Sequence, residues 1–225
     1  MWRDPAAGGA DAHPATVLSV AKPWEEPGAA RLRPVRVVAV LGVPGSGKST
    51  QARLVAAELG GVARSVGDWV RARAAAGDRA AAETVHTGQA IPPALYRAFL
   101  DDGAWPALLV LDGSPRDEHH VAVLADAVAT RGPQVTGVLL DLPADRAAAR
   151  VAGRRSTRPD DAGPVAAARV AGQAAALAGL VTAFRARWPL TVVDATAPPA
   201  AVTARILRSA AAPGPGCPPG AGRSS

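Results

Sequence analysis

A glycine-rich segment that contains a single lysine has the residue types and spacing to bind a polyphosphate. Residues 42–50 read GVPGSGKST and match the phosphate-loop pattern G-x-x-x-x-G-K-S/T. Glycines allow successive backbone N–H groups to face phosphate oxygens, and the helix that follows adds partial positive charge at its N-terminus. Lys48 would reach the β- and γ-phosphates, and the Ser49 hydroxyl would face Mg²⁺. The alternative is a glycine-rich turn that ends in an exposed lysine.

Two further segments place charged side chains directly after apolar runs. The run Leu108–Leu111 is followed by DGSPR, where Asp112 could hold a water of Mg²⁺ or could instead be a turn or cap residue. The short run Val62–Ser65 is followed by Asp68, which is placed to cap a helix that carries Arg71. Taken alone, Arg71 is more typical of a solvated surface arginine.

Arginines gather in a third segment, which contains Arg150, Arg154, Arg155, Arg158 and Arg169. Arg150 and Arg154 are four residues apart and share one face of a helix. Clustered guanidinium groups repel one another unless an anion lies among them, and their planar forks suit polyphosphate oxygens. The alternatives are a solvated basic helix and neutralisation by Asp160 and Asp161.

Apolar strands that alternate with helical patterns are the elements that must position these residues. The expected strands are Val35–Leu41, Val62–Ser65, Leu108–Leu111, Val135–Leu142 and Leu190–Val193. Helical patterns cover Gln51 to Leu59 and Val121 to Val128, and Pro143 opens another helix. The sequence therefore predicts an α/β fold, a P-loop three-layer sandwich with a five-stranded parallel sheet and helices on both faces. Ligands bind such sheets at the carboxyl ends of the strands, where the charged segments lie.

Composition and length predict one domain with extensions. Residues 1–34 are rich in Pro, Gly and Ala and predict a flexible extension, residues 35–210 predict the domain, and residues 211–225 predict a disordered tail. The single Cys217 excludes an internal disulfide framework and favours a reducing compartment. No secretion signal is evident at the N-terminus, and no apolar run approaches the roughly 20 residues of a membrane span. We therefore expect a cytoplasmic protein with no membrane partner.

The net charge is +6, with 23 Arg and two Lys, so nucleic acid is a partner to consider. One Tyr, two Phe and the lack of a basic stripe interleaved with aromatic residues disfavour that role, and no nucleic-acid partner is expected.

In combination, these motifs resemble adenylate kinase and its nucleoside monophosphate kinase relatives from residue 35 to about 208. The family pattern G-x-P-G-x-G-K-x-T-Q matches residues 42–51, S-T-G-D-x-x-R matches 65–71 and D-G-F-P-R matches 112–116. R-x-x-x-R followed by R-x-D-D and a further arginine matches the third segment, residues 150–169. Several motifs in the family's order are far more specific than any one of them.

The resemblance implies roles for individual residues. Those implied to bind ATP are Gly42, Pro44, Gly45, Ser46, Gly47, Lys48, Ser49, Thr50, Arg150 and Arg154. Those implied to bind the acceptor monophosphate are Ser65, Val66, Arg71, Gln89, Ile91, Gly113, Arg116, His120, Arg158 and Arg169. The implied catalytic set is Lys48, Arg116, Arg154, Arg158 and Arg169. Ser49 and Asp112 are implied to hold Mg²⁺, partly through water.

The family also implies a monomer that makes two ADP from ATP and AMP, with an acceptor-binding insert at about 65–95 and a short lid at about 154–158. The lid has no Cys, which excludes a zinc-bearing form. Alternatives are a P-loop kinase for another nucleoside monophosphate or small metabolite, and a nucleotide-binding regulator without turnover.

At three positions the sequence departs from the family. Val66 replaces a threonine, Ser114 replaces a phenylalanine, and His120 replaces the glutamine that reads adenine. By the resemblance, all three bear on the pocket for the acceptor base. The adjacent pair His119 and His120 could instead suggest a metal, although such a pair is more typical of a surface.

Overall fold

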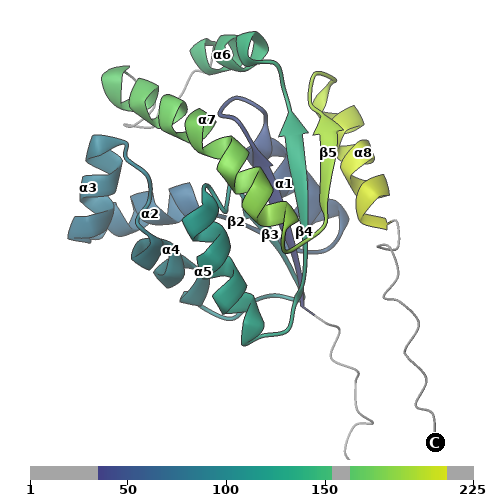
Figure 1. The fold of residues 1–225 in the computed structure, drawn as a ribbon, viewed down its shortest axis with the longest axis horizontal. Coiled ribbons are helices and arrows are strands. Elements are labelled where there is room, and N and C mark those ends of the chain that lie inside the picture. Colours follow the sequence, from purple (N-terminus) through teal and green to yellow (C-terminus); the bar gives the residue numbers. More distant parts are fainter. Residues whose placement is uncertain (1–34, 154–162, 212–225) are drawn as a thin grey trace, which may run out of the picture. The chain divides into compact units, whose positions relative to one another are not determined.

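The apolar runs form a five-stranded, all-parallel sheet in the order β2-β3-β1-β4-β5 (Figure 1). The structure is a computed structural model that describes residues 35–153 and 163–211. The expected N-terminal extension, the short lid and all but the first residue of the expected tail lie outside these ranges. The strands are β1 Arg36–Gly42, β2 Val62–Ser65, β3 Leu108–Asp112, β4 Gln134–Asp141 and β5 Leu190–Asp194.

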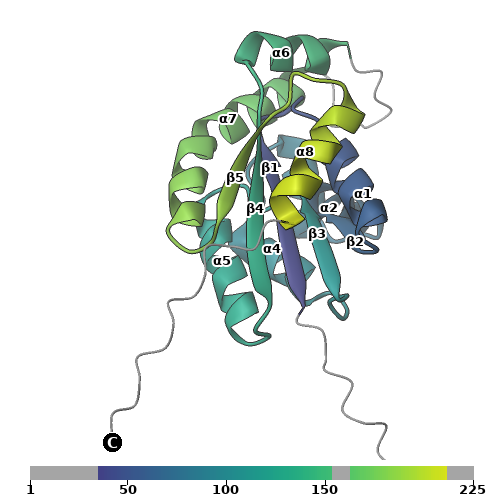
Figure 2. The same ribbon diagram turned by 90° about the vertical axis from the view of Figure 1, so that its right-hand side faces the viewer.

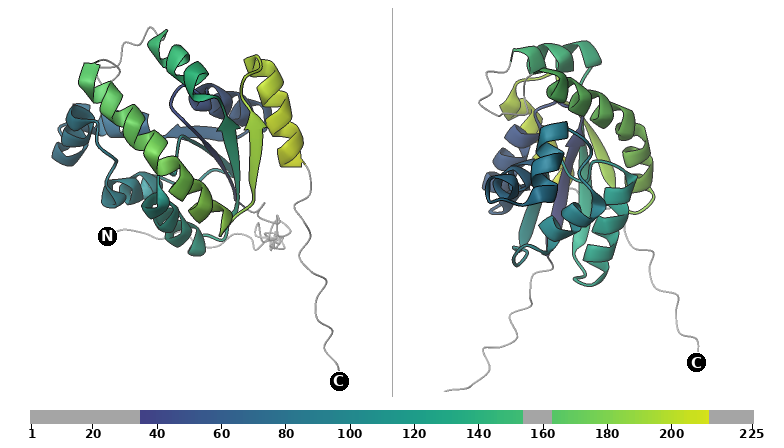
Figure 3. Two further views of the ribbon diagram at one scale, coloured as in Figure 1. Left: turned by 45° about the horizontal axis from the view of Figure 1, so that its top comes forward. Right: turned by 90° about the vertical axis from the view of Figure 1, so that its left-hand side faces the viewer.

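Helices cover both faces of the sheet, which confirms the three-layer prediction. They are α1 Lys48–Glu58, α2 Val66–Ala75, α3 Arg79–Thr87, α4 Pro93–Asp101, α5 Glu118–Ala129, α6 Ala144–Ala152, α7 Gly163–Arg185 and α8 Pro199–Ala211. One face of the sheet carries α1 and α8, and the other carries α4, α5 and α7 (Figures 2 and 3). None of the helices in the described ranges has both the length and the apolar character needed to cross a membrane.

Successive residues of β1 point to opposite faces, because side chains alternate along a strand. Val37 and Leu41 pack in the core under α4, α5 and α7, whereas Val38 and Val40 pack in the core under α1 and α8. A strand buried on both faces reads as a continuous apolar run, which is the pattern seen in the sequence.

Several element boundaries differ from the predictions by a few residues. Strands β3 and β5 each continue through an aspartate, Asp112 and Asp194, because strand pairing depends on the backbone rather than on an apolar side chain. Helix α1 begins at Lys48 instead of Gln51, since the end of the phosphate loop forms its first turn. Helix α8 continues to Ala211, the residue at which the sequence predicts the start of the tail.

The N-cap of α2 is Ser65, so the prediction that Asp68 caps this helix is wrong. The Ser65 hydroxyl accepts a hydrogen bond from the Asp68 backbone N–H at 3.2 Å. Asp68 instead lies in the first turn, where its carboxylate complements the helix dipole and pairs with Arg71.

A buried glutamine connects the first helix to the last. The Gln51 amide donates to the Pro199 carbonyl at 3.0 Å and accepts from the Thr203 hydroxyl at 2.8 Å. Gln51 directly follows the phosphate loop, residues 42–50, so these bonds hold the end of that loop against α8.

Candidate functional site

The phosphate loop runs from the end of β1 to the start of α1. The N-cap of α1 is Gly47, which has a left-handed backbone and offers no side-chain acceptor to the first-turn N–H groups. Those N–H groups, together with the dipole of the helix, make this end of α1 suited to an anion. The predicted loop residues Pro44, Ser49 and Thr50 lie in the same segment.

Close packing explains why glycine occupies two positions of the loop. A Cβ on Gly42, which has a φ of 140°, would lie 2.8 Å from the Leu140 carbonyl oxygen and 2.8 Å from the buried Ser46 hydroxyl. A Cβ on Gly45 would lie 2.5 Å from the Ala147 carbonyl oxygen of α6. Both contacts are too close for any side chain, so the loop can pack against β4 and α6 only with glycine there.

The Lys48 side chain folds back across the loop. Its ammonium group donates to the Gly42 carbonyl at 2.9 Å and to the Val43 carbonyl at 2.8 Å. A Cβ on Gly113 would lie 3.2 Å from Lys48 Cε. The lysine stem therefore passes directly beside the segment that follows β3.

Two guanidinium groups meet beside Gly67, in the first turn of α2. A Cβ built on Gly67 would lie 3.0 Å from Arg116 Nη2 and 3.5 Å from Arg71 Nη1. Arg116 Nε donates to the Gly113 carbonyl at 3.2 Å, and Arg71 forms an ion pair with Asp68. Two planar cationic forks at one place are suited to a phosphate group.

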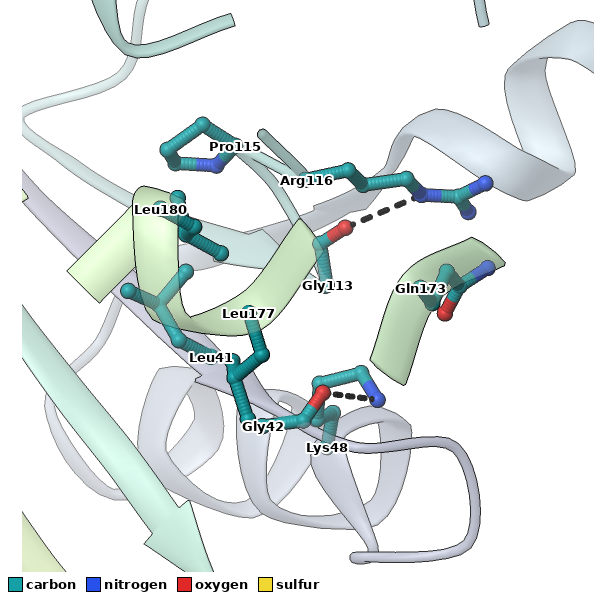
Figure 4. A pocket seen from close by; sticks show the side chains of 9 residues that line it. All are labelled: Leu41, Gly42, Lys48, Gly113, Pro115, Arg116, Gln173, Leu177 and Leu180. Atoms are coloured by element: carbon teal, nitrogen blue, oxygen red, sulfur yellow. Dashed lines mark hydrogen bonds between the residues drawn. The ribbon is translucent and has the colours of Figure 1, made fainter. Parts of the chain in front are cut away.

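Lys48 and Arg116 line one pocket (Figure 4). Its full lining is Leu41, Gly42, Lys48, Gly113, Pro115, Arg116, Gln173, Leu177 and Leu180. In Figure 4 the ends of Lys48, Arg116 and Gln173 lie toward one side, and the leucines lie toward the other. Sequence reasoning missed Gln173, although it lies four residues after Arg169 and hence on the same face of α7.

A second cavity of about 190 Å³ adjoins the first, because Arg116 and Gln173 line both. Its lining is Thr87, Gly88, Gln89, Ala90, Arg116, Asp117, Gly172, Gln173 and Ala176. Gln89, a predicted acceptor-binding residue, is therefore in this wall. Helix α7 contributes Gly172, Gln173 and Ala176 to the lining.

The three residues that depart from the family do not face this cavity. Val66, Ser114 and His120 are each 0% exposed. Val66 packs in the core under α4, α5 and α7, Ser114 donates to the Tyr96 hydroxyl at 2.7 Å, and the His120 ring stacks on Tyr96. In this structure the three side chains therefore lie in the core behind the cavity, and their influence on the pocket for the acceptor base stays a prediction.

Burial shifts the pKa values of Tyr96 and His120 in opposite directions. It raises the pKa of the Tyr96 phenol, because the phenolate would lose its solvation. It lowers the pKa of His120, because the imidazolium would lose its solvation, although the nearby Asp117 carboxylate partly opposes this. His120 is thus not a surface histidine, and no group of three potential metal-ligating side chains occurs within residues 35–153 and 163–211.

Of the remaining predicted site residues, those that the structure describes do not line either of these two pockets. Asp112 is 8% exposed at the end of β3, in register with Val40 of β1. Ile91 is buried, and Arg150 donates to the Ala195 carbonyl at 3.1 Å. Arg154 and Arg158 lie outside the described residues, as does the side chain of Arg169, whose backbone is in α7.

Comparisons with known proteins give one consistent result. A family model described as an AAA domain matches residues 41–165, more than half of the chain. The adenylate kinase of Deinococcus radiodurans is 32% identical over 187 residues, which cover 76% of this chain and 95% of that protein. The adenylate kinase of Caulobacter sp. (strain K31) is 30% identical over 170 residues, 70% of this chain and 89% of that protein. The adenylate kinase of Streptomyces lividans is 32% identical over 133 residues, 56% of this chain and 66% of that protein.

Proposed function

Because the chain belongs to the adenylate kinase family, we propose that it transfers the γ-phosphoryl group of ATP to AMP and forms two ADP. The observation that carries this proposal is the shared lining of two adjoining pockets. Lys48 and Arg116 lie in one, and Arg116 continues into the second. An arginine common to both is placed where two phosphorylated ligands would meet.

The donor side of the site is built by the phosphate loop. The first-turn N–H groups of α1 would bind the phosphate oxygens of ATP, and the Lys48 ammonium would leave the Gly42 and Val43 carbonyls to bind the β- and γ-phosphates. A compact ammonium can make this exchange because it pivots on a flexible stem. Arg150 and Arg154 would lie against the nucleotide.

The acceptor side is the cavity of about 190 Å³. Arg71 and Arg116 would hold the α-phosphate of AMP, because their guanidinium groups already meet beside Gly67. The base would lie between Gln89 and the small residues of α7, among them Gly172. The polar side chains that could read it are Gln89, Asp117 and Gln173, rather than His120.

The residues then supply charge and position. The phosphoryl group moves in line from donor to acceptor, and negative charge on its oxygens must be stabilised throughout. Lys48 and Arg116 supply fixed positive charge at that point, together with Arg158 and Arg169 in our proposal. No covalent intermediate with the enzyme is needed, so no nucleophilic side chain is expected in the site.

The residues present fit Mg²⁺ as the cofactor. The Ser49 hydroxyl is in the first turn of α1, and the Asp112 carboxylate ends the strand that pairs with β1. Hydroxyl and carboxylate oxygens, with substrate phosphates and water, are the ligands that Mg²⁺ prefers. Bound with ATP, the ion would neutralise charge on the phosphates. We further propose that the protein acts in the cytoplasm as a monomer.

A coupled assay tests the function with ATP and a panel of AMP, CMP, UMP and GMP. AMP should give ADP, and Lys48→Met should lower kcat by about 10²–10³-fold because one charged donor is removed from the transferring phosphate. Lys22→Met is the matched control. Lys22 is the other lysine of the sequence and lies outside the predicted domain, so its replacement should leave kcat unchanged. No diphosphate from any acceptor would refute the proposal. Turnover of a non-nucleotide acceptor alone would indicate another P-loop kinase, and ATP binding without transfer would indicate a regulator.

A further inference from the structure

The buried His120 contacts the backbone of two segments that line the acceptor cavity, and its own side chain does not line it. His120 Nε2 lies 2.8 Å from the Ile91 carbonyl oxygen, and its Nδ1 accepts from the Arg116 backbone N–H at 3.4 Å. The ring stacks on Tyr96 of α4, with centroids 4.2 Å apart. Asp117 caps α5 by accepting from the His120 N–H at 2.8 Å, which fixes where this side chain enters the core.

These contacts require one neutral form of the imidazole. A backbone N–H can only donate, so Nδ1 must be the acceptor for Arg116. The hydrogen of the ring is then on Nε2, which donates to the Ile91 carbonyl. The ionisable groups that face the ring are Tyr96 of α4 and, beside it, Arg116, Asp117 and His119. A proton added to Nδ1 would point at the hydrogen of the Arg116 N–H, so protonation of the ring would break this hydrogen bond.

The partners of His120 adjoin the residues that line the cavity. Ile91 lies in the acceptor loop, residues 88–92, in which Gln89 and Ala90 face the cavity. On the other side, Arg116 lines the cavity itself. His120 therefore ties the backbone of the acceptor loop to the backbone of the phosphate-binding arginine without entering the cavity.

We propose that His120 is a positioning residue for the acceptor, which holds the acceptor loop through the bond from Nε2–H to the Ile91 carbonyl. This inference rests on the proposed function and replaces the direct reading of the base that the resemblance implies for this position. A loop released from this bond would bind the acceptor more weakly. Loss of this bond alone keeps the bond between His120 Nδ1 and the Arg116 backbone N–H, so ATP binding and the transfer step should change little.

Two amide variants separate the two bonds of the ring. In His120→Gln the side-chain nitrogen can take the place of Nε2 and donate to Ile91. In His120→Asn the shorter side chain reaches the Arg116 N–H but not the Ile91 carbonyl. Both variants lose the stack on Tyr96, so each controls for the general effect on stability.

The expected result is a split between kinetic constants. His120→Asn should raise the KM for AMP about tenfold, since a buried hydrogen bond is lost, with kcat and the KM for ATP within about twofold. His120→Gln should keep the KM for AMP within about threefold of the unmodified protein. Equal changes of this KM in both variants, or a fall in kcat alone, would overturn the proposal.

Two measurements decide the proposal independently of turnover. Hydrogen exchange of the amides of residues 88–91, without substrates, should be faster in His120→Asn than in His120→Gln. Nitrogen NMR of the unmodified protein at neutral pH should show His120 as the neutral Nε2–H form. If no acceptor is phosphorylated, the proposed function fails while these measurements still judge the positioning role. Equal exchange, or an Nδ1–H or charged ring, would overturn that role.

Discussion

The hydrogen bond between Tyr96 and Ser114 is the perturbation that best tests the buried polar core. Both side chains are 0% exposed, and the Ser114 hydroxyl donates to the Tyr96 hydroxyl at 2.7 Å. Tyr96→Phe removes one oxygen atom and keeps the ring on which His120 stacks. The change therefore isolates the hydrogen bond from the packing of the aromatic ring.

The size of the effect follows from complete burial. Tyr96→Phe leaves the Ser114 hydroxyl without this acceptor and out of reach of water, which costs about 1–3 kcal/mol of unfolding free energy. Ser114→Ala should cost a similar amount, because it leaves the phenol unpaired. The double variant removes both polar groups at once, so its loss should be smaller than the sum of the single losses by about 1–2 kcal/mol.

Urea unfolding followed by tryptophan fluorescence measures these values, since Trp69 and Trp105 pack against the same core. Ser209→Ala on α8 is the matched control, because its hydroxyl bonds to the Ile206 carbonyl and α8 covers the opposite face of the sheet. Combined with Tyr96→Phe, this control should be additive within about 0.5 kcal/mol. If the double variant Tyr96→Phe with Ser114→Ala is equally additive, so that its loss equals the sum of the two single losses, the reasoning that the two hydroxyls depend on each other is refuted.

Three other predictions concern single residues. Arg116→Lys should lower kcat/KM for AMP by about 10²–10³-fold in the coupled assay, because an ammonium cannot reproduce the planar fork, whereas Arg185→Lys at the end of α7 should not change it. Burial keeps the pKa of His120 below that of the unfolded chain, so the unfolded state takes up its proton first as the pH falls below about 6.5. Thermal unfolding at pH 7.5 and 5.5 should therefore show a loss of stability on acidification that is smaller in His120→Gln, and identical losses would contradict this. Gly137→Ala should lower the unfolding free energy by about 1–3 kcal/mol in urea, because its Cβ would lie 2.5 Å from Phe184 Cε1; an unchanged midpoint would show that α7 can move away from the sheet.

The sequence was sufficient for the sheet and the phosphate loop because both follow from local patterns. Buried parallel strands read as continuous apolar runs, and the loop has a fixed spacing of Gly, Lys and Ser. The wrong cap of α2 arose because two residues were equally suitable. Ser65 and Asp68 are both good N-caps, and only the extended backbone of Ser65 decides between them.

The acceptor pocket was less predictable because its walls come from distant segments. The burial of His120 depends on Tyr96 of α4, a contact that no spacing rule connects to it. Gln173 could have been found from its position four residues after Arg169, whereas the cavity that Gln173 lines depends on how α7 lies across the sheet. The domain boundaries and the roles of Arg154 and Arg158 stay predictions.

The bonds of Gln51 to α8 also affect the order in which the site can mature during synthesis. Gln51 leaves the ribosome 152 residues before Thr203, so its amide gains that partner only after α8 has been synthesised. A nascent chain that ends before α8 has its phosphate loop without this brace. Such a chain should bind ATP more weakly, and nucleotide capture would improve once α8 has been synthesised and can pack beside α1.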